Sequence, residues 1–299
     1  MIEAHRLTKK FETLAALDEI DLQIRPGTVF GLVGSNGSGK STLLRLVSGV
    51  YMPDGGEILV DGLRPFNDLS VKSRVFFLPD NPYFVHQSNV NEMAGFYRMF
   101  YGRFSEERFR YLCGVFPIDP RMRISRMSKG MQRQAALMLA LSCEPDVLLL
   151  DEAFDGLDPI IRQVLRRLLA DSIAQQGLTV VIASHNLREL EDLCDHVGLL
   201  HRGKILFNSE LDLLKSRLHK IQAAFKTVPT PDRFEWLEVL KIQQQGSLLH
   251  MVVRGDRDEV EAKLRTLDPV FLEIMPPTLE EIFIYELEVT GYDIRSILS

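Results

Sequence analysis

The hydrophobic pattern of the chain changes along its length and predicts regions of different architecture. In the first region, short apolar runs alternate with segments of helical spacing, which predicts a parallel sheet joined by right-handed crossovers. From about residue 211, alternating strands and two helices predict a compact α+β appendix. The buried strands of the first region are expected at residues 29–33, 74–78, 147–150, 178–183 and 197–200.

Two parts of the first region depart from this alternation. The N-terminal part is β-rich, because residues 20–24 and 57–62 alternate between apolar and polar side chains beside Pro-Gly and Gly-Gly turns. Residues from about 82 to 142 instead have helical spacing. We therefore expect an α/β domain over residues 1–210, with a helical subdomain at about 82–142, and a second domain over residues 211–299.

Aromatic side chains are frequent in the expected helical subdomain. Phe96, Tyr97, Phe100 and Tyr101 recur at a spacing typical of a helix. Aromatic residues at this spacing usually belong to a hydrophobic core, and this is the first interpretation. The second is an exposed face that docks a partner, since aromatic residues are enriched in binding hot spots.

One loop of the first domain has the composition of a phosphate-binding loop. It fits G-x-x-x-x-G-K-[ST] and lies between an expected strand and an expected helix, so we infer that it binds a nucleotide. Its glycines let successive backbone N–H groups face an anion, and the helix dipole adds positive potential. Lys40 can reach the β- and γ-phosphates, and the Ser41 hydroxyl can bind Mg²⁺. The loop consists of Gly34, Ser35, Asn36, Gly37, Ser38, Gly39, Lys40, Ser41 and Thr42.

Two adjacent carboxylates follow the apolar run at residues 147–150. Asp151 and Glu152 therefore lie at the carboxyl edge of the expected sheet, where open α/β sheets bind their ligands. Beside a phosphate loop, such a pair suits one carboxylate that holds a metal ion and one that orients or deprotonates water. Ser128 and Gly130 open a further expected helix, whose free N–H groups could face an anion, although a capping serine is the simpler explanation.

Composition narrows the class of protein. The net charge of −6 and the pI near 5.7 argue against a nucleic acid as the main partner. No apolar run approaches the ~20 residues that span a bilayer, and the first residues lack the apolar core of a secretory signal. Cys113, Cys143 and Cys194 are scattered and lack metal-ligand spacing, which is typical of reduced thiols. We expect a cytoplasmic protein.

Taken together, these motifs resemble the ATP-binding subunit of an ABC (ATP-binding cassette) transporter over roughly residues 1–207. The phosphate loop resembles the Walker A motif, and residues 147–152 resemble the Walker B strand. Residues 128–132 stand where the family has its LSGGQ signature, and residues 155–158 resemble its D-loop. The signature residues are Ser128, Lys129, Gly130, Met131 and Gln132.

The resemblance extends to single positions. Phe11 stands where an aromatic ring stacks on adenine, Asp158 ends the D-loop, and His185 stands where the family has its switch histidine. The resemblance implies an ATPase that uses ATP and Mg²⁺ and works as a head-to-tail dimer. Each ATP would lie between the Walker motifs of one protomer and the Ser128 and Gly130 signature positions of the other.

In that dimer, Glu152 would be the general base for the attacking water, and His185 would contact the γ-phosphate. ATP would close the dimer and hydrolysis would open it, and this motion would drive a separate transmembrane permease. The permease contact is expected near residues 80–105. The expected Mg²⁺ ligands are Ser41, Asp80 and Asp151.

Some positions depart from the usual family pattern. Asp80 stands where the family has a glutamine, so a carboxylate replaces an amide that can donate a hydrogen bond. Lys129 and Met131 replace glycine and glutamine in the signature. These features and the ending at residues 276–283 resemble the ABC-2 exporter branch, which includes peptide, bacteriocin and drug exporters. We therefore expect export of a peptide, lipid-like or drug substrate, with residues 211–299 stabilising or regulating the dimer.

Two other functions fit the sequence less well. A soluble ABC-type ATPase acting on nucleic acid or ribosomes is the alternative, but the sequence shows neither a long coiled coil nor tandem cassettes. A P-loop kinase or GTPase would leave the signature and His185 unexplained. We expect a protein held at the inner face of the cell membrane by its permease, with no nucleic acid partner. The dimer is either a homodimer or a pseudo-symmetric heterodimer.

Overall fold

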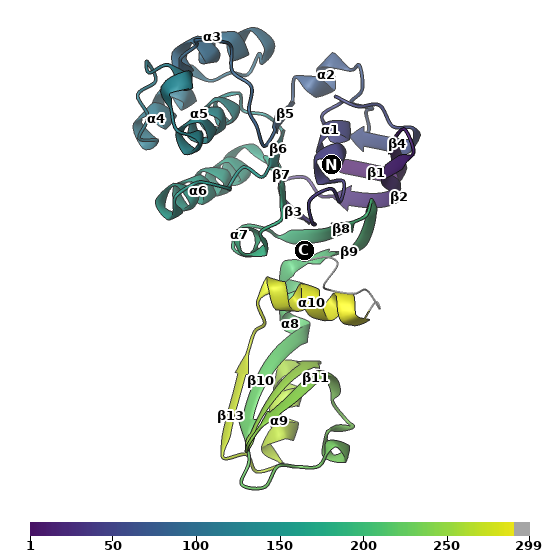
Figure 1. Ribbon diagram of the computed structural model, residues 1–299. Helices are drawn as coiled ribbons and strands as arrows, with labels where there is room; N and C mark the ends of the chain where they lie inside the picture. Colours follow the sequence, from purple (N-terminus) through teal and green to yellow (C-terminus); the bar gives the residue numbers. More distant parts are fainter. Residues whose placement is uncertain (290–299) are drawn as a thin grey trace. The chain divides into compact units, whose positions relative to one another are not determined.

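The computed structural model describes residues 1–289 and divides the chain into two compact units (Figure 1). Unit 1 comprises Met1–Asn208 and unit 2 begins at Ser209, close to the boundary expected at residue 210. A separate cluster of buried apolar side chains lies in each unit. The units are therefore described one at a time.

A six-stranded sheet forms the centre of unit 1, in the order β5–β6–β7–β3–β8–β9. Its first five strands pair in parallel, as the apolar runs predict. β3 and β6 are buried at every position, which explains their continuous apolar sequence. β9 follows β8 after a tight turn and is an edge strand that the pattern did not indicate. The bounds are β3 Val29–Val33, β5 Val75–Leu78, β6 Val147–Asp151, β7 Thr179–Ser184, β8 His196–His201 and β9 Lys204–Glu210.

A smaller antiparallel sheet, β2–β1–β4, accounts for the β-rich N-terminal part. Helix α1 contacts β2 and β4 of this sheet and β6 of the central sheet. The apolar side chains Leu43, Leu44, Leu46 and Val47 of α1 are buried, so this helix joins the two sheets through one core. The bounds are β1 Ile2–Phe11, β2 Leu14–Ile24, β4 Gly55–Val60 and α1 Lys40–Val47.

The helical part of unit 1 packs around α5. This helix contacts α3, α4 and β5, and most of its residues are buried (Figure 1). Asn89 begins α3 with a reciprocal capping box to Glu92, and Ser105 caps α4. The bounds are α2 Leu69–Lys72, α3 Val90–Phe100, α4 Glu106–Val115, η1 Ile124–Arg126 and α5 Lys129–Ser142.

The aromatic residues of α3 and the residue after it divide between the two interpretations. Tyr97 and Tyr101 pack on Phe76 of β5, with ring centroids 5.4 and 5.3 Å apart, and burial raises the pKa of Tyr97 to about 12. Phe96 and Phe100 are instead 39% and 61% exposed. The core interpretation is therefore correct for the tyrosines and wrong for the two phenylalanines, because helical spacing alone does not show which side faces the protein.

Helices α6 and α7 follow the loops that leave β6 and β7 of the central sheet. α6 spans Pro159–Gln176, with Asp158 as its cap, Pro159 in its first turn and Gly177 in a left-handed conformation at its end. α7 spans Leu187–Glu191.

Unit 2 contains a four-stranded antiparallel sheet in the order β11–β12–β10–β13. One side of this sheet contributes Ile221, Ala223 and Met251 to a core with Leu264 of α9. The bounds are α8 Leu211–Arg217, β10 Leu218–Ala224, η2 Pro231–Phe234, β11 Glu238–Gln245, β12 Leu248–Arg254, α9 Arg257–Arg265, β13 Phe271–Met275 and α10 Leu279–Val289.

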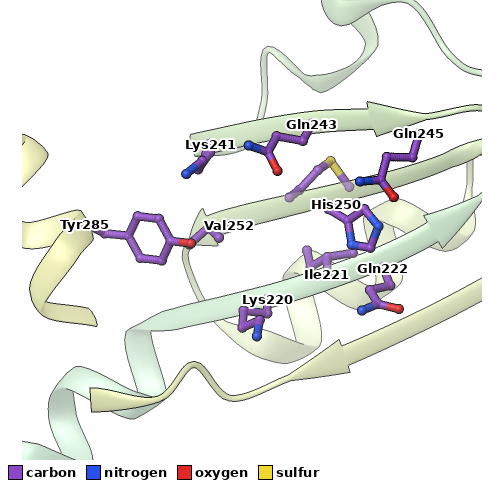
Figure 2. A pocket seen from close by; sticks show the side chains of 10 residues that line it. Lys220, Ile221, Gln222, Lys241, Gln243, Gln245, His250, Val252 and Tyr285 are labelled. Atoms are coloured by element: carbon purple, nitrogen blue, oxygen red, sulfur yellow. The ribbon is translucent and has the colours of Figure 1, made fainter. Parts of the chain in front are cut away.

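The other side of the unit 2 sheet is polar. Figure 2 shows a shallow pocket of about 280 Å³ there, lined by lysine, glutamine and histidine side chains from β10, β11 and β12, with Tyr285 of α10 at one end. Alternation along β10 explains the contrast, because Lys220 and Gln222 point away from the core that Ile221 enters. Lys220 is paired with Glu281 at 2.7 Å.

Unit 2 also contains the single tryptophan of the chain. Trp236 is 39% exposed, donates a hydrogen bond from Nε1 to the Arg233 carbonyl at 2.7 Å, and lies with its ring centroid 5.3 Å from Lys263 Nζ. Among the helices formed by residues 1–289, none is long and apolar enough to cross a membrane.

Candidate functional site

The register of the central sheet brings three loops to one edge. β7 lies between β3 and β6, and all three strands run in the same direction. Asp151 is opposite Ala183, and Val33 is opposite Ser184. The phosphate loop, the second carboxylate and the histidine therefore leave the sheet beside one another, at the edge where α/β sheets bind ligands.

The phosphate loop curls around the side chain of Lys40. Gly39 has φ of +113°, and a Cβ there would lie 2.4 Å from the Ala16 carbonyl oxygen, so this position requires glycine. Lys40 Nζ donates hydrogen bonds to the carbonyl oxygens of Gly34 at 2.6 Å and Ser35 at 3.2 Å. The Lys40 side chain is only 6% exposed, and burial lowers its pKa. The loop thus places a buried cation beside its backbone.

The residues present fit a nucleotide and its metal ion. Ser38 is buried, and its hydroxyl has no hydrogen-bond partner within the described residues, so a polar atom is available inside the loop. The Ser41 hydroxyl hydrogen-bonds Asp151, whose pKa is raised mainly by burial. A hydroxyl and a carboxylate are oxygen donors of the kind that Mg²⁺ prefers. Residues 1–289 contain no preformed cluster of three or more His, Cys, Asp or Glu ligands, so phosphate oxygens and water would complete the coordination.

Glu152 joins three of the motifs. Its Oε2 lies 3.0 Å from His185 Nδ1, and its Oε1 lies 3.7 Å from Lys40 Nζ. Its backbone has φ of +49°, which is unusual for a residue with a side chain and is found preferentially at functional sites. The Glu152 side chain is 16% exposed, so the carboxylate is largely enclosed but reachable.

The signature residues form the start of α5. The Ser128 hydroxyl accepts a hydrogen bond from the Met131 N–H at 3.2 Å, so it is the N-cap that the simpler explanation predicted. Gln132 Nε2 donates to the carbonyl oxygens of Ile124 and Met127 and fixes the segment before the helix. Within residues 1–289, no hydrogen bond or ion pair joins residues 128–132 to the phosphate loop of the same chain.

Asp80 has an arginine partner that the sequence did not reveal. Asp80 Oδ1 accepts a hydrogen bond from Arg133 Nη2 at 2.8 Å, and Asn81 Nδ2 donates to Asp80 Oδ2 at 3.2 Å. The partner could not be predicted, because Asp80 and Arg133 lie on separate elements far apart in the chain. The role of Asp80 at Mg²⁺ stays a prediction.

Comparison with known proteins identifies the family of the chain. The family model described as "ABC transporter" matches residues 17–155. The ABC transporter ATP-binding protein YtrB of Bacillus subtilis is 31% identical over 285 residues, covering 95% of this chain and 97% of the relative. The chain belongs to the ATP-binding subunits of ABC transporters. It is therefore an ABC ATPase, whose ATP hydrolysis is coupled to transport.

Other similar proteins agree with this assignment. The bacitracin transport ATP-binding protein BcrA of Bacillus licheniformis is 29% identical over 223 residues, covering 74% of this chain and 73% of the relative. A solved structure of an ATP-binding subunit of an ABC transporter is 25% identical, with a TM-score of 0.67, and covers 72% of this chain and 92% of that one. The expected ABC ATPase fold is confirmed. Cassettes of this family dimerise and act with permease subunits in transporter complexes.

The remaining expected positions of the ABC ATPase have separate local roles. Phe11 is 41% exposed and meets Tyr51 edge-to-face at 5.5 Å, with Lys9 Nζ 5.5 Å from the Phe11 ring centroid. Tyr51 was missed, although an aromatic residue soon after the phosphate-loop helix was a visible signal. Asp158 caps α6 by accepting a hydrogen bond from the Ile161 N–H at 3.0 Å.

A buried glutamate behind the histidine loop of the ABC ATPase was also missed. Glu189 is 6% exposed, and Arg162 of α6 lies 3.3 Å from it. The hydroxyl of Ser184 lies 3.4 Å from Glu189 Oε2 and accepts a hydrogen bond from the Asn186 N–H. Burial raises the pKa of Glu189. This network supports the backbone on both sides of His185.

Proposed function

We propose that this ABC ATPase is the ATP-hydrolysing subunit of an exporter and binds two Mg²⁺-ATP between two cassettes. The observation that carries the proposal is the position of Glu152, which meets Lys40 and His185 beside the phosphate loop. A carboxylate there can accept a proton from water that attacks a phosphate held by the loop. Its two partners fix the direction in which it points.

The residues of the chain divide the work of hydrolysis. The backbone N–H groups of the phosphate loop and Lys40 bind the phosphates, and Ser41 and Asp151 hold the metal ion. Bound Mg²⁺ supplies positive charge that neutralises the phosphate oxygens. Glu152 is the general base, His185 is the γ-phosphate contact, and Phe11, whose side chain is 41% exposed, is the adenine contact.

The proposed dimer is head-to-tail. The start of α5 exposes Ser128 and Lys129, and within residues 1–289 no hydrogen bond joins this turn to the phosphate loop of the same chain. A second cassette supplies the missing phosphate, so each ATP lies between the Walker motifs of one copy and the signature of the other. Whether the second cassette is an identical copy or a paralogue is left open.

The proposed partner is a transmembrane permease that contacts residues 80–105. In this range, α3 exposes the large apolar side chains of Phe96, Met99 and Phe100. Neighbouring exposed apolar side chains of this kind are typical of a protein–protein contact. Such a permease would hold the protein at the cytoplasmic face of the membrane. Export of a peptide, lipid-like or drug substrate is supported by the similarity to the bacitracin transport protein BcrA. Unit 2 is proposed to stabilise or regulate the dimer.

The decisive experiment replaces the proposed base. We expect Glu152→Gln to lower ATP turnover at least a hundredfold, since a neutral amide cannot accept the proton, while ATP binding is kept and the dimer accumulates. Steady-state ATPase assays and size-exclusion chromatography with Mg²⁺-ATP measure both effects. Lys40→Ala is the control, because it is expected to lose ATP binding and therefore the dimer. Normal turnover by Glu152→Gln would show that another group is the base.

The alternative function is a soluble ABC-type ATPase that acts on nucleic acid or ribosomes. Tagged Glu152→Gln protein captured from native cells with Mg²⁺-ATP separates the two. Recovery of a polytopic membrane protein supports the transporter. That protein would be the permease, and its identity gives a route to the substrate. Recovery of ribosomes or DNA-bound proteins in its place would contradict the transporter proposal.

A further inference from the structure

Arg133, in the first turns of α5, reaches two loops that leave the central sheet. Its Nη2 donates hydrogen bonds to the Asp80 carbonyl oxygen at 2.9 Å and to Asp80 Oδ1 at 2.8 Å, in the loop after β5. Its Nη1 donates to the Asp155 carbonyl oxygen, in the loop after β6. One guanidinium therefore connects the signature helix to both loops.

The surroundings show that this arrangement is close-packed. The Arg133 side chain is only 14% exposed, whereas its partners Asp80 and Asp155 are 50% and 67% exposed. A Cβ placed on Gly130 would lie 3.1 Å from the Gly156 carbonyl oxygen, so the signature and the D-loop are in near contact. A cleft of about 340 Å³ opens beside these residues. Arg133 thus lies where three segments meet: the start of α5, the loop after β5 and the loop after β6.

We infer that Arg133 is a positioning residue that holds the signature and the D-loop in one fixed arrangement for the ATP of the opposite cassette. This inference rests on the proposed head-to-tail dimer. Ser128 and Gly130 can meet a phosphate of the second copy only if the start of α5 is held in place. The helix is tied there by Arg133, whose hydrogen bonds end on loops that also lead to the proposed catalytic groups.

The chemistry of arginine suits this role. Its planar guanidinium presents several N–H donors in a rigid fork, so one side chain can bind two carbonyl groups and a carboxylate at once. A lysine has the same charge but a single nitrogen on a flexible stem. We therefore expect Arg133→Lys to resemble Arg133→Gln rather than the unaltered protein.

The same contacts give Asp80 a role that does not need a metal ion. Both of its carboxylate oxygens already have protein donors, Arg133 at Oδ1 and Asn81 at Oδ2. Asp80 acts through Arg133, because its negative charge keeps the guanidinium oriented between the loops. A glutamine at this position would lack that charge.

The test measures dimerisation in the full-length Glu152→Gln background. Arg133→Gln, Arg133→Lys, Asp80→Asn and the double variant Asp80→Asn/Arg133→Gln are compared by sedimentation with Mg²⁺-ATP. We expect Arg133→Gln and Arg133→Lys each to weaken dimerisation about tenfold, which is about 1.4 kcal/mol. Binding of a fluorescent ATP analogue to the monomer should stay unchanged. The double variant should be no worse than Arg133→Gln, because the two residues act as one pair.

A matched control excludes a general effect of losing an arginine. Arg110 lies exposed on α4, and its Nε donates to the carbonyl oxygen of Glu106 in the same helix, so Arg110→Gln should dimerise normally. A Mg²⁺ titration of ATP binding distinguishes the two roles of Asp80. An unchanged half-saturation in Asp80→Asn supports its action through Arg133, and a raised half-saturation with normal dimerisation overturns it.

Other outcomes separate this inference from the proposed function. If the Glu152→Gln parent does not dimerise with ATP, the proposed dimer fails and the inference fails with it. If the parent dimerises and Arg133→Gln dimerises equally well, only the inference is overturned. Parallel loss of monomer ATP binding and thermal stability in Arg133→Gln would show a purely structural role and would also overturn it.

Discussion

At the scale of single residues, the site buries two ionisable side chains, Asp151 and Lys40, which the stability of the fold alone would not favour. Asp151 is 2% exposed at the end of β6, and burial raises its pKa above the ordinary 3.8. Lys40 is buried beside it with a lowered pKa. Both groups therefore cost stability when charged, and the structure retains them for the chemistry of a bound nucleotide.

The raised pKa of Asp151 predicts a pH dependence of stability. Because the folded state binds the proton more tightly than the unfolded state, the contribution of Asp151 is fully present below about pH 3.8 and is lost as pH rises through the folded pKa. Asp151→Asn removes this loss of stability at higher pH, because the amide does not ionise, and its oxygen still accepts a hydrogen bond from Ser41. We expect the variant to be more stable than the unaltered protein at neutral pH, with a difference that narrows as pH falls.

Urea unfolding of the nucleotide-free protein at several pH values measures this difference. Ser172→Ala is a suitable control, because it changes a buried hydroxyl of α6 that hydrogen-bonds Leu168 and does not titrate. An Asp151→Asn stability that follows the unaltered protein at every pH would contradict the assignment.

At the scale of elements, α3 has an unpaired apolar surface that a partner would cover. We expect Phe100→Ser to weaken capture of the co-expressed permease about tenfold, which corresponds to a hot-spot contribution of about 1.4 kcal/mol. Basal ATPase activity should be unchanged, since Phe100 is 61% exposed and lies outside the phosphate loop. Leu69→Ser on α2, at 82% exposure, is the matched control. Full capture by Phe100→Ser would exclude this face as the permease contact.

The elements also show how far the sequence can predict this fold. The phosphate loop, the carboxylate pair and the parallel strands follow from local patterns that need no knowledge of distant residues. Strand β1 was not predicted, because its register shifts between Ala4 and Leu7 and again before Lys9, which interrupts the period of two. The Arg133–Asp80 pair is formed only by tertiary packing, so no local pattern could reveal it.

At the scale of the whole molecule, each unit has an apolar cluster of its own. The cluster of unit 1 is drawn from residues 2–205, and that of unit 2 from residues 221–274. We therefore expect a chain ending at Glu210, which keeps β9 complete, to unfold cooperatively and to bind Mg²⁺-ATP. In the Glu152→Gln background it should dimerise several-fold more weakly than the full chain. Unchanged dimerisation and ATPase activity would exclude a dimer-stabilising or regulatory role for unit 2.

The position of Trp236 gives the unaltered chain a built-in optical reporter. Trp236 is the sole tryptophan of the sequence and belongs to unit 2. Fluorescence excited at the red edge of protein absorbance, where only tryptophan absorbs, therefore comes from that unit alone. The lysine ammonium beside the ring and the hydrogen bond at Nε1 make its emission sensitive to small local rearrangements. A spectral change on adding nucleotide would therefore reveal communication from the cassette to its appendix, without any label or engineered residue.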